Sequence, residues 1–395
     1  MKHEFFIFLI TTCFIFTGCS NQERLNTEIY TIDFVQGFDT EQQMFVSEIA
    51  DSVEYLELKT PDDIVITRIW EIIQFDDYLL IKARWDAYLF HKNGQFIRQI
   101  GARGQGPGEY NVAGSIDVDR KRKEIVIVDV RKFLFYDFEG NFLRSNKREG
   151  YAPEIAFSDT MMWAGDVISS ANTKYQAVAV SLQGDTLAYI HNSLYGINKS
   201  DHTLHSSHSQ VIFFYYEKDF LYFKGDMSND TIWKISGVSA EPYAFIDMGK
   251  YKMPVEYEPW HSSMDTYQSN CERYWSVCSM VEGDHHFFLL SNWRGYSKRE
   301  KGFGEFKYMV YDKETKKTFS VKDKNGLGFT DDIHGGPPIW PRLASGDYYM
   351  NTIETHKLLE MIEEGEYTPS PQLEELLSRI DDYSNDLVIL IHRKK

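Results

Sequence analysis

A glycine-rich run contains the first group of residues in this sequence that could do ligand chemistry. The run Gly101-Ala-Arg-Gly-Gln-Gly-Pro-Gly-Glu-Tyr110 includes Arg103, Glu109 and Tyr110. It lacks the Gly-Lys-Ser/Thr ending of a phosphate-binding loop and does not open a helix, so it does not predict a nucleotide site. Glycines of this kind allow tight backbone turns. We therefore interpret the run as a crossing between two units of sheet, and its three polar or aromatic side chains as candidate ligand contacts.

Further candidates combine an aromatic ring with a polar side chain outside the clearest strands. A ring face can stack on a sugar or a peptide while the neighbouring polar group forms hydrogen bonds. Aromatic residues make up 15% of the chain, so most of them are expected in the core. The candidate ligand contacts of this kind are Trp260, His261, Trp293, Arg294, His334, Trp340 and Arg342.

Motifs for catalysis or metal binding are weak. The sequence contains no nucleophile elbow and no His-Glu-x-x-His motif. His202, His205 and His208 could bind a metal if they shared a helix face, but the serine-rich segment favours an exposed loop. Paired carboxylates such as Asp76-Asp77 lie at turns, where Asp is favoured. We name no catalytic residue, no metal ligand and no cofactor, and keep a divalent metal as an alternative because ligands from separate repeats leave no local motif.

Two cysteines could pair in an oxidising compartment. Cys271 and Cys278 are separated by six residues, which is too far for a disulfide on one straight strand or helix and feasible only across a turn. The spacing leaves both a disulfide and two partly buried thiols open.

The elements that must position these residues are short strands arranged in a repeat. Residues 78–98 and 124–144 align without a gap, and their glycines Gly94 and Gly140 lie 46 residues apart. Each copy has the pattern of a strand, a turn, a second strand, a glycine-containing hairpin and a third strand. Weaker copies begin near residues 161, 220, 286 and 347. A period in the forties with several strands per unit predicts the blades of a β-propeller.

The two ends of the repeated region predict how the ring closes. Val53–Leu58 precedes the first long repeat and Leu387–His392 follows the last, and neither has a local partner. Placing both in one blade removes two exposed sheet edges, which would otherwise invite aggregation. We therefore predict an all-β, six-bladed β-propeller over residues 46–395, closed by pairing of its N- and C-terminal strands. Insertions are expected at about 250–275 and, with helices before the last strand, at about 354–385.

The N-terminus predicts export. Lys2 is followed by the apolar run Phe5–Phe16 and then by Thr17-Gly18-Cys19. A basic start, a short apolar core and small residues are typical of a signal peptide, here residues 1–18, which is too short to span a bilayer as a mature helix. A cysteine in this place resembles the lipobox of bacterial lipoproteins, which implies acylation of Cys19. Residues 19–45 would then be a lipidated tether and N-terminal segment.

Charge restricts the class of partner. The formal net charge is −17 at pH 7, which argues against a nucleic-acid binder because such proteins need a basic face. Outside the signal peptide, the sequence has no apolar stretch long enough to cross a membrane. Contact with the membrane is therefore expected through the lipid anchor. We expect a monomer.

Several segments together resemble the six-bladed, NHL-repeat-like propeller lipoproteins of Bacteroides-type bacteria. The matching pieces are residues 101–110, Val53–Leu58 with Lys59-Thr-Pro-Asp62, Asp230–Ile235, and Asp332–Gly336 followed by Trp340-Pro341. The closing strand also matches, although members usually carry Asn-Pro where Asn385-Asp386 stands. The resemblance extends from about residue 30 to 395. It implies the fold and the lipidation, and no general reaction.

Two functions of different class follow. We predict an outer-membrane lipoprotein, periplasmic or surface-exposed, that acts as a binding or scaffold module for a glycan, a peptide or a protein partner and is not an enzyme. The alternative is a propeller hydrolase or lyase of a lactone, sugar or peptide with a divalent metal in the central channel. Such a metal would need ligands from at least three blades that converge on one point. A structural part of an envelope complex with no small ligand is a third possibility.

Overall fold

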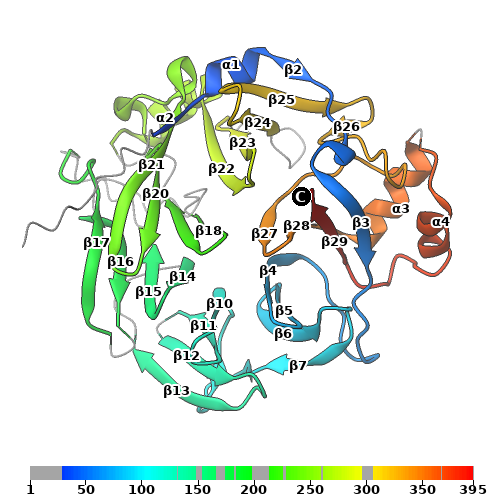
Figure 1. Ribbon diagram of the computed structural model, residues 1–395. Coiled ribbons are helices and arrows are strands. Elements are labelled where there is room, and N and C mark those ends of the chain that lie inside the picture. Colours follow the sequence, from blue (N-terminus) through cyan, green and yellow to red (C-terminus); the bar gives the residue numbers. More distant parts are fainter. Residues whose placement is uncertain are drawn as a thin grey trace, which may run out of the picture.

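The computed structural model describes residues 29–130, 132–147, 154–165, 174–181, 184–197, 213–225, 228–258, 261–295, 306–365 and 367–394. Within these ranges the chain forms six antiparallel sheets arranged around a central axis, as predicted (Figure 1). Each sheet is a blade of four strands in a meander, and two blades carry additional outer strands.

The first three blades follow one another along the chain. Blade one contains β4 (Ile69–Phe75), β5 (Tyr78–Ala83), β6 (Asp86–His91) and β7 (Phe96–Ile100). Blade two contains β10 (Ser115–Asp119), β11 (Glu124–Asp129), β12 (Lys132–Asp137) and β13 (Phe142–Lys147). Blade three contains β14 (Glu154–Ser158), β15 (Met161–Gly165), β16 (Tyr175–Val180) and β17 (Thr186–His191).

The other three blades complete the ring. Blade four contains β18 (Phe213–Glu217), β19 (Phe220–Lys224), β20 (Thr231–Ser236) and β21 (Ser239–Asp247). Blade five contains β22 (Trp275–Glu282), β23 (His286–Trp293), β24 (Phe306–Asp312) and β25 (Lys317–Asp323), with the short β26 (Gly326–Leu327) beside β25. Blade six contains β27 (Leu343–Ser345), β28 (Tyr348–Ile353), β29 (Leu387–Arg393) and β3 (Ala50–Leu56).

Blade six closes the propeller by the predicted pairing of distant strands. The C-terminal β29 pairs antiparallel with the N-terminal β3, with Leu390 opposite Glu54 and His392 opposite Ser52. The innermost strands also contact one another in a complete circle, from β4 through β10, β14, β18, β22 and β27 back to β4. The ring therefore leaves no gap between the first blade and the last.

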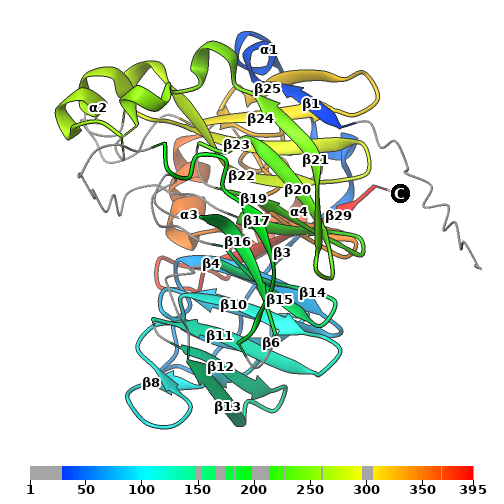
Figure 2. The ribbon, with the colours of Figure 1, turned by 90° about the vertical axis from the view of Figure 1, so that its left-hand side faces the viewer.

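A segment before β3 strengthens the outside of the ring. This N-terminal belt, residues 30–48, comprises β1 (Tyr30–Asp33), α1 (Phe34–Asp39), β2 (Glu41–Gln42) and the 3-10 helix η1 (Val46–Glu48). β1 pairs parallel with β21 and β2 pairs parallel with β25, so the belt covers the outer edges of blades four and five (Figures 1 and 2). The Asp33 carboxylate accepts a hydrogen bond from the Gln36 backbone N–H at 2.8 Å and caps the helix.

The two predicted insertions lie between strands of the ring. Between blades four and five the chain forms η2 (Gly249–Tyr251), η3 (Val255–Tyr257), α2 (Met264–Asn270) and η4 (Cys271–Arg273). Between β28 and β29 it forms α3 (Thr355–Glu364) and α4 (Pro371–Leu377), which bury Leu358, Leu373 and Leu376 against Leu387. A short pair, β8 (Ala102–Arg103) and β9 (Glu109–Tyr110), lies within the glycine-rich run. In the described part of the chain, no helix has the length and apolar character needed to cross a membrane.

The core consists of separate apolar clusters between neighbouring blades. For example, Leu80 and Leu89 of blade one pack with Ile127 and Leu134 of blade two. The β6–β7 and β12–β13 hairpins each have a glycine at positive φ. Gly94 has a φ of 81°, and a Cβ atom there would come within 2.1 Å of the Glu57 carbonyl oxygen. The repeat glycine is therefore required for both backbone conformation and space.

Candidate ligand site in the central channel

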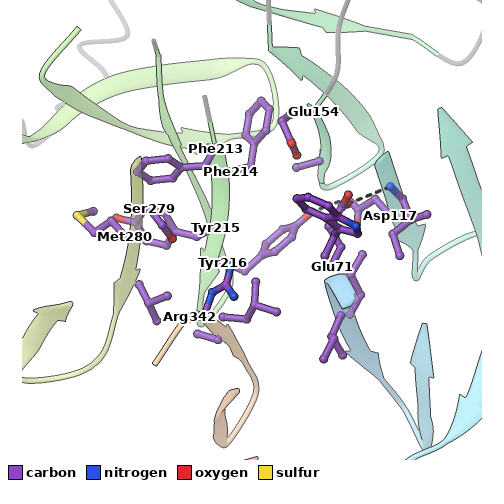
Figure 3. A pocket seen from close by; sticks show the side chains of 18 of the residues that line it. Glu71, Asp117, Glu154, Phe213, Phe214, Tyr215, Tyr216, Ser279, Met280 and Arg342 are labelled. Carbon is purple, nitrogen blue, oxygen red and sulfur yellow. Dashed lines mark hydrogen bonds between the residues drawn. The ribbon is translucent and has the colours of Figure 1, made fainter. Parts of the chain in front are cut away.

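All six innermost strands line one cavity of about 290 Å³ on the propeller axis. Figure 3 shows its side chains converging from different blades. Blades one to three contribute the carboxylates Glu71, Asp117 and Glu154. Blades four to six contribute mostly aromatic or neutral side chains and one cation, namely Phe213, Phe214, Tyr215, Tyr216, Cys278, Ser279, Met280 and Arg342. The cavity therefore has an acidic half and a half whose charged group is a guanidinium.

Glu71 is held rigidly in the wall of the cavity. One carboxylate oxygen forms an ion pair with Lys82, whose ammonium group also donates to the Gly114 carbonyl. The other oxygen accepts hydrogen bonds from the Ser115 hydroxyl at 3.2 Å and the Ile116 backbone N–H at 3.1 Å. Glu71 thus joins blade one to blade two, and Lys82 balances its charge.

Asp117 lies almost completely buried, with 3% of its surface exposed. Its carboxylate accepts hydrogen bonds from the Tyr216 hydroxyl at 2.8 Å, the Phe157 backbone N–H at 2.7 Å and the Val118 backbone N–H at 2.8 Å. Burial raises the pKa of Asp117 to about 6, and these hydrogen bonds oppose the rise. The Asp117–Tyr216 pair connects blades two and four, which lie on either side of blade three.

Glu154 differs from the other two carboxylates of the cavity in its contacts. Within the described part of the chain its side chain makes no ion pair and no hydrogen bond. Burial first, and then repulsion from Glu71, raise the pKa of Glu154 to about 8, while Lys82 lowers it. Figure 3 shows the carboxylate near the Phe214 ring at the edge of the cavity.

Arg342 supplies the positive charge on the other side. It precedes β27 and its guanidinium points into the cavity below Tyr216 in Figure 3. Burial raises the pKa of the Cys278 thiol to about 12, against an opposing effect of the Arg342 charge. The thiol therefore stays protonated at neutral pH, which makes it a poor nucleophile.

A second cavity of about 200 Å³ is lined by the ends of β10, β14 and β18 and the turns that follow them. It shares Asp117 and Tyr216 with the first cavity, so this hydrogen-bonded pair forms part of the wall of both. Its rim carries charges that are already balanced, because Lys121 pairs with Asp159 and Lys218 pairs with Asp284 at 2.5 Å. The first cavity is therefore the better candidate for a ligand.

Comparison with known proteins places the chain in a family. Residues 29–392 match the family model DUF4934, a domain of unknown function. The chain belongs to the DUF4934 family. No curated protein matches it. The family match spans the belt, the six blades and the closing strand.

One of the solved structures that are similar to this DUF4934 chain supports its fold. A crystal structure of a Bacteroides fragilis protein described as exported superposes with a TM-score of 0.71 at 18% identity, covering 93% of this chain and 100% of that one. BamB from Moraxella catarrhalis is 11% identical with a TM-score of 0.40, covering 67% of this chain and 66% of that one. A protein of unknown function from Bacteroides caccae is 12% identical with a TM-score of 0.39, covering 66% and 84%.

Of the predicted ligand contacts, the structure brings one into the cavity. That residue is Arg342. Trp340 is buried and stacks on Tyr308 and Phe329, and Tyr110 is buried between blades one and two. These two aromatic residues pack the core because the crossings they occupy run between the blades and not along the channel.

The polar residues of the glycine-rich run form contacts within the run or with the neighbouring strand β6. Arg103 pairs with Asp86 at 2.9 Å, and Glu109 accepts a hydrogen bond from the Gly106 backbone N–H at 2.7 Å. Neither residue lines the axial cavity. The Arg103 guanidinium and the Glu109 carboxylate stabilise the crossing between blades one and two.

Three candidates from later in the chain also have hydrogen-bond or ion-pair partners within the fold. Arg294 forms a bidentate ion pair with Glu258 at 2.7–2.8 Å, and both side chains are buried. The Trp293 indole N–H donates to the Glu272 carbonyl at 2.6 Å. The His334 ring lies between the Ser370 hydroxyl at 3.0 Å and the Val53 carbonyl at 2.8 Å.

The remaining candidates lie elsewhere or outside the described residues. His261 belongs to the turn before α2 and does not line the axial cavity. Trp260, the three histidines between residues 202 and 208, and the lipidation candidate Cys19 lie outside the described residues.

The disulfide that the sequence left open is not formed. Cys271 and Cys278 are both free thiols. Cys271 lies in η4, whereas Cys278 lies within the extended strand β22, which carries it away from η4. Their closest hydrogen-bond acceptors are the Gln268 and Leu290 carbonyls, at 3.5 Å and 3.2 Å.

Sequence reasoning missed the three cavity carboxylates. They occur in short apolar strands, in the segments Ile-Trp-Glu71, Ser-Ile-Asp117 and Pro-Glu154-Ile. An acidic residue within the first three positions of the innermost strand in each of blades one to three was the available signal. Over the residues that the structure describes, no group of three or more His, Cys, Asp or Glu side chains gathers in a way that could hold a metal ion.

Proposed function

We propose that this DUF4934 chain is a binding module of the cell envelope that takes a small polar ligand into its central channel. One observation carries the proposal. A single cavity of about 290 Å³ collects carboxylates, aromatic rings and a guanidinium from all six blades. Ligand sites typically combine apolar walls with a few placed polar groups, and this cavity has that composition.

The closed ring supports binding without large rearrangement. Each cavity side chain projects from a strand that is hydrogen-bonded within its blade, and the ring is closed by β3 and β29. Ligand groups held on rigid elements lose little conformational freedom on binding, which favours affinity. Scaffolding of a protein partner would use the same rigidity.

The proposal includes an anchored location. The signal peptide and Cys19 of the lipobox support a lipoprotein of the outer membrane, with the propeller held on the periplasmic or the outer side. The resemblance to NHL-repeat-like propeller lipoproteins supports the same location. We propose a monomer that contacts the membrane through its lipid and has no nucleic-acid partner, in keeping with its net charge of −17.

Binding can be tested with the mature chain, from which the signal peptide and the acylated cysteine have been removed. Glycan arrays and peptide libraries identify ligands, and calorimetry measures their affinity for the unmodified chain and for Arg342→Gln. A ligand whose binding is weakened about tenfold or more by the channel substitution supports the proposal. A ligand whose affinity is unchanged in every channel variant would place the binding surface elsewhere and contradict it.

A second candidate function rests on the split between two carboxyl groups. The pKa of Asp117 is about 6 and that of Glu154 is about 8, so at pH 7 one is mostly ionised and the other mostly protonated. Such pairs can act as base and acid in hydrolases or lyases. Turnover of lactones, glycosides or peptides that is lost in Glu154→Gln would favour this candidate. Its metal-dependent form has no ligand set among the described residues.

A further inference from the structure

Two ionisable side chains of the channel, Glu154 and Arg342, have no ion-pair partner among the described residues and lie on opposite blades. Glu154 belongs to blade three and Arg342 immediately precedes the first strand of blade six, and the third and sixth blades of a six-membered ring face each other across the axis. Figure 3 shows the two side chains on different sides of the same cavity. Within the described ranges, no ion pair joins them to each other or to a third residue.

The charge balance of each side points to an oppositely charged ligand group. On the acidic side, Lys82 compensates Glu71, and Asp117 accepts hydrogen bonds from Tyr216 and two backbone N–H groups. Glu154 has no such partner among the described residues, and a ligand ammonium group beside it would favour its ionised form. On the other side, the Arg342 guanidinium faces an aromatic and neutral wall that includes Tyr308 and Cys278. Partly buried charges are costly unless they are paired, so each side favours a ligand group of the opposite sign.

Size and wall composition limit the ligand further. The cavity volume of about 290 Å³ is at the small end of the range for ligand pockets. It can hold a molecule of a few residues but is too small for a folded domain. Phe213, Phe214 and Trp70 supply apolar surface, and cations favour the faces of such rings. An ammonium group near Glu154 would therefore meet both a carboxylate and an aromatic wall.

We infer that the channel ligand is a small zwitterion, a free amino acid or a short peptide, with its ammonium group at Glu154 and its carboxylate at Arg342. This inference rests on the proposed function, because it assumes that the channel is the ligand site. A neutral sugar would leave both charges unpaired, and a simple anion would meet the acidic half of the cavity. The opposed charges also give the ligand one orientation along the cavity.

The experiment compares matched ligands. Calorimetry with the full mature chain uses an equimolar tripeptide library and single free amino acids, and the best binder is then prepared with an acetylated N-terminus and with an amidated C-terminus. Charge-assisted hydrogen bonds are each worth about 1.5–3 kcal/mol, so each modification is expected to weaken binding about tenfold to a hundredfold.

Two variants locate the ends of the ligand. Glu154→Gln is expected to weaken binding of the free peptide about tenfold or more and to leave the affinity for the acetylated peptide unchanged. Arg342→Gln is expected to weaken binding of the free peptide by a similar factor and to leave the affinity for the amidated peptide unchanged. Glu241→Gln, at an exposed position of β21, is the matched control and should bind as the unmodified chain does. Melting temperatures confirm that all variants are folded.

The outcomes separate this inference from the proposed function. If neutral oligosaccharides bind and Trp70→Ala or Arg342→Gln weakens them, the channel is a binding site but the zwitterion is wrong. Equal affinity for free, acetylated and amidated peptides also overturns it. If no amino acid, peptide or glycan binds, or if no channel substitution changes the affinity of one that does, both the inference and the proposed function fail.

Discussion

Glu154 is a carboxyl group whose ionised form is disfavoured by its surroundings. Burial and Glu71 raise the pKa of this carboxyl group to about 8, whereas in an unfolded chain it would titrate near 4.5. A group whose pKa is raised on folding contributes stability below its unfolded pKa and loses that contribution as the pH rises through its folded pKa. The folded protein should therefore lose stability from Glu154 between about pH 4.5 and pH 8.

We predict that Glu154→Gln raises the melting temperature at pH 8.5 and changes it little at pH 4.5. Gln is neutral at every pH, so the variant avoids the cost of ionising a desolvated carboxyl group in the folded state. The other charged groups that face this carboxyl are Glu71 and Lys82, and both are retained. Thermal melts at the two pH values, with Glu241→Gln as the exposed control, measure the effect. An equal gain at both pH values would show that ionisation is not its cause.

Arg294, a candidate ligand contact in the sequence, forms an ion pair with Glu258 in the structure. Both side chains are at least 96% buried and they share two hydrogen bonds. We predict that Arg294→Met lowers the free energy of unfolding by about 3–5 kcal/mol, because it leaves a buried carboxylate uncompensated. Urea unfolding measures this loss. The double variant Glu258→Leu/Arg294→Met should recover most of the stability, and an equally unstable double variant would contradict the explanation.

At the scale of elements, the sequence predicted the structural features that depend on a local pattern of residues. The hairpin glycines Gly94 and Gly140 appear in register 46 residues apart, and their backbone φ values of 81° and 77° explain why glycine repeats there. The closing strand was predicted from its lack of a local partner, and β29 does pair with β3. The belt was assigned to the tether because β1 and β2 are only four and two residues long. Strands so short, paired in parallel to distant partners, carry no periodic signal of their own.

The belt is expected to stabilise the outer edges of blades four and five. Phe34 of α1 is fully buried, and its ring packs against Phe38 and Tyr251. We predict that Phe34→Ala costs about 3–5 kcal/mol of unfolding free energy, as large-to-small changes in a packed core do. Denaturant unfolding gives the value, and Ile29→Ala, at a residue with 48% exposure, is the control. If the two variants are equally stable, the belt is not part of the cooperative fold.

At the scale of the whole molecule, the candidate site exists only because the ring is closed. Glu71 and Arg342 are separated by more than half of the chain, yet they line one cavity. A sequence pattern within one blade contains no information about which side chains of six blades meet on the axis. Loop residues such as Trp340 therefore looked more functional than the strand residues Asp117 and Glu154. The channel residues could be predicted only after the register of every innermost strand was known.

Closure itself can be tested by covalently joining the two strands that complete blade six. Ser52 of β3 and His392 of β29 are directly opposite in the register, so Ser52→Cys together with His392→Cys should form a disulfide. The bond would close a loop of about 340 residues, and restriction of the unfolded chain should then stabilise the fold by up to about 5 kcal/mol. Melting temperatures of the oxidised and reduced double variant measure the gain, and Ser52→Cys alone, which has no partner thiol on β29, controls for the substitution. Equal melting temperatures with the bond formed would contradict the predicted gain in stability. Failure of the bond to form under oxidising conditions would mean that the two strands are not held side by side.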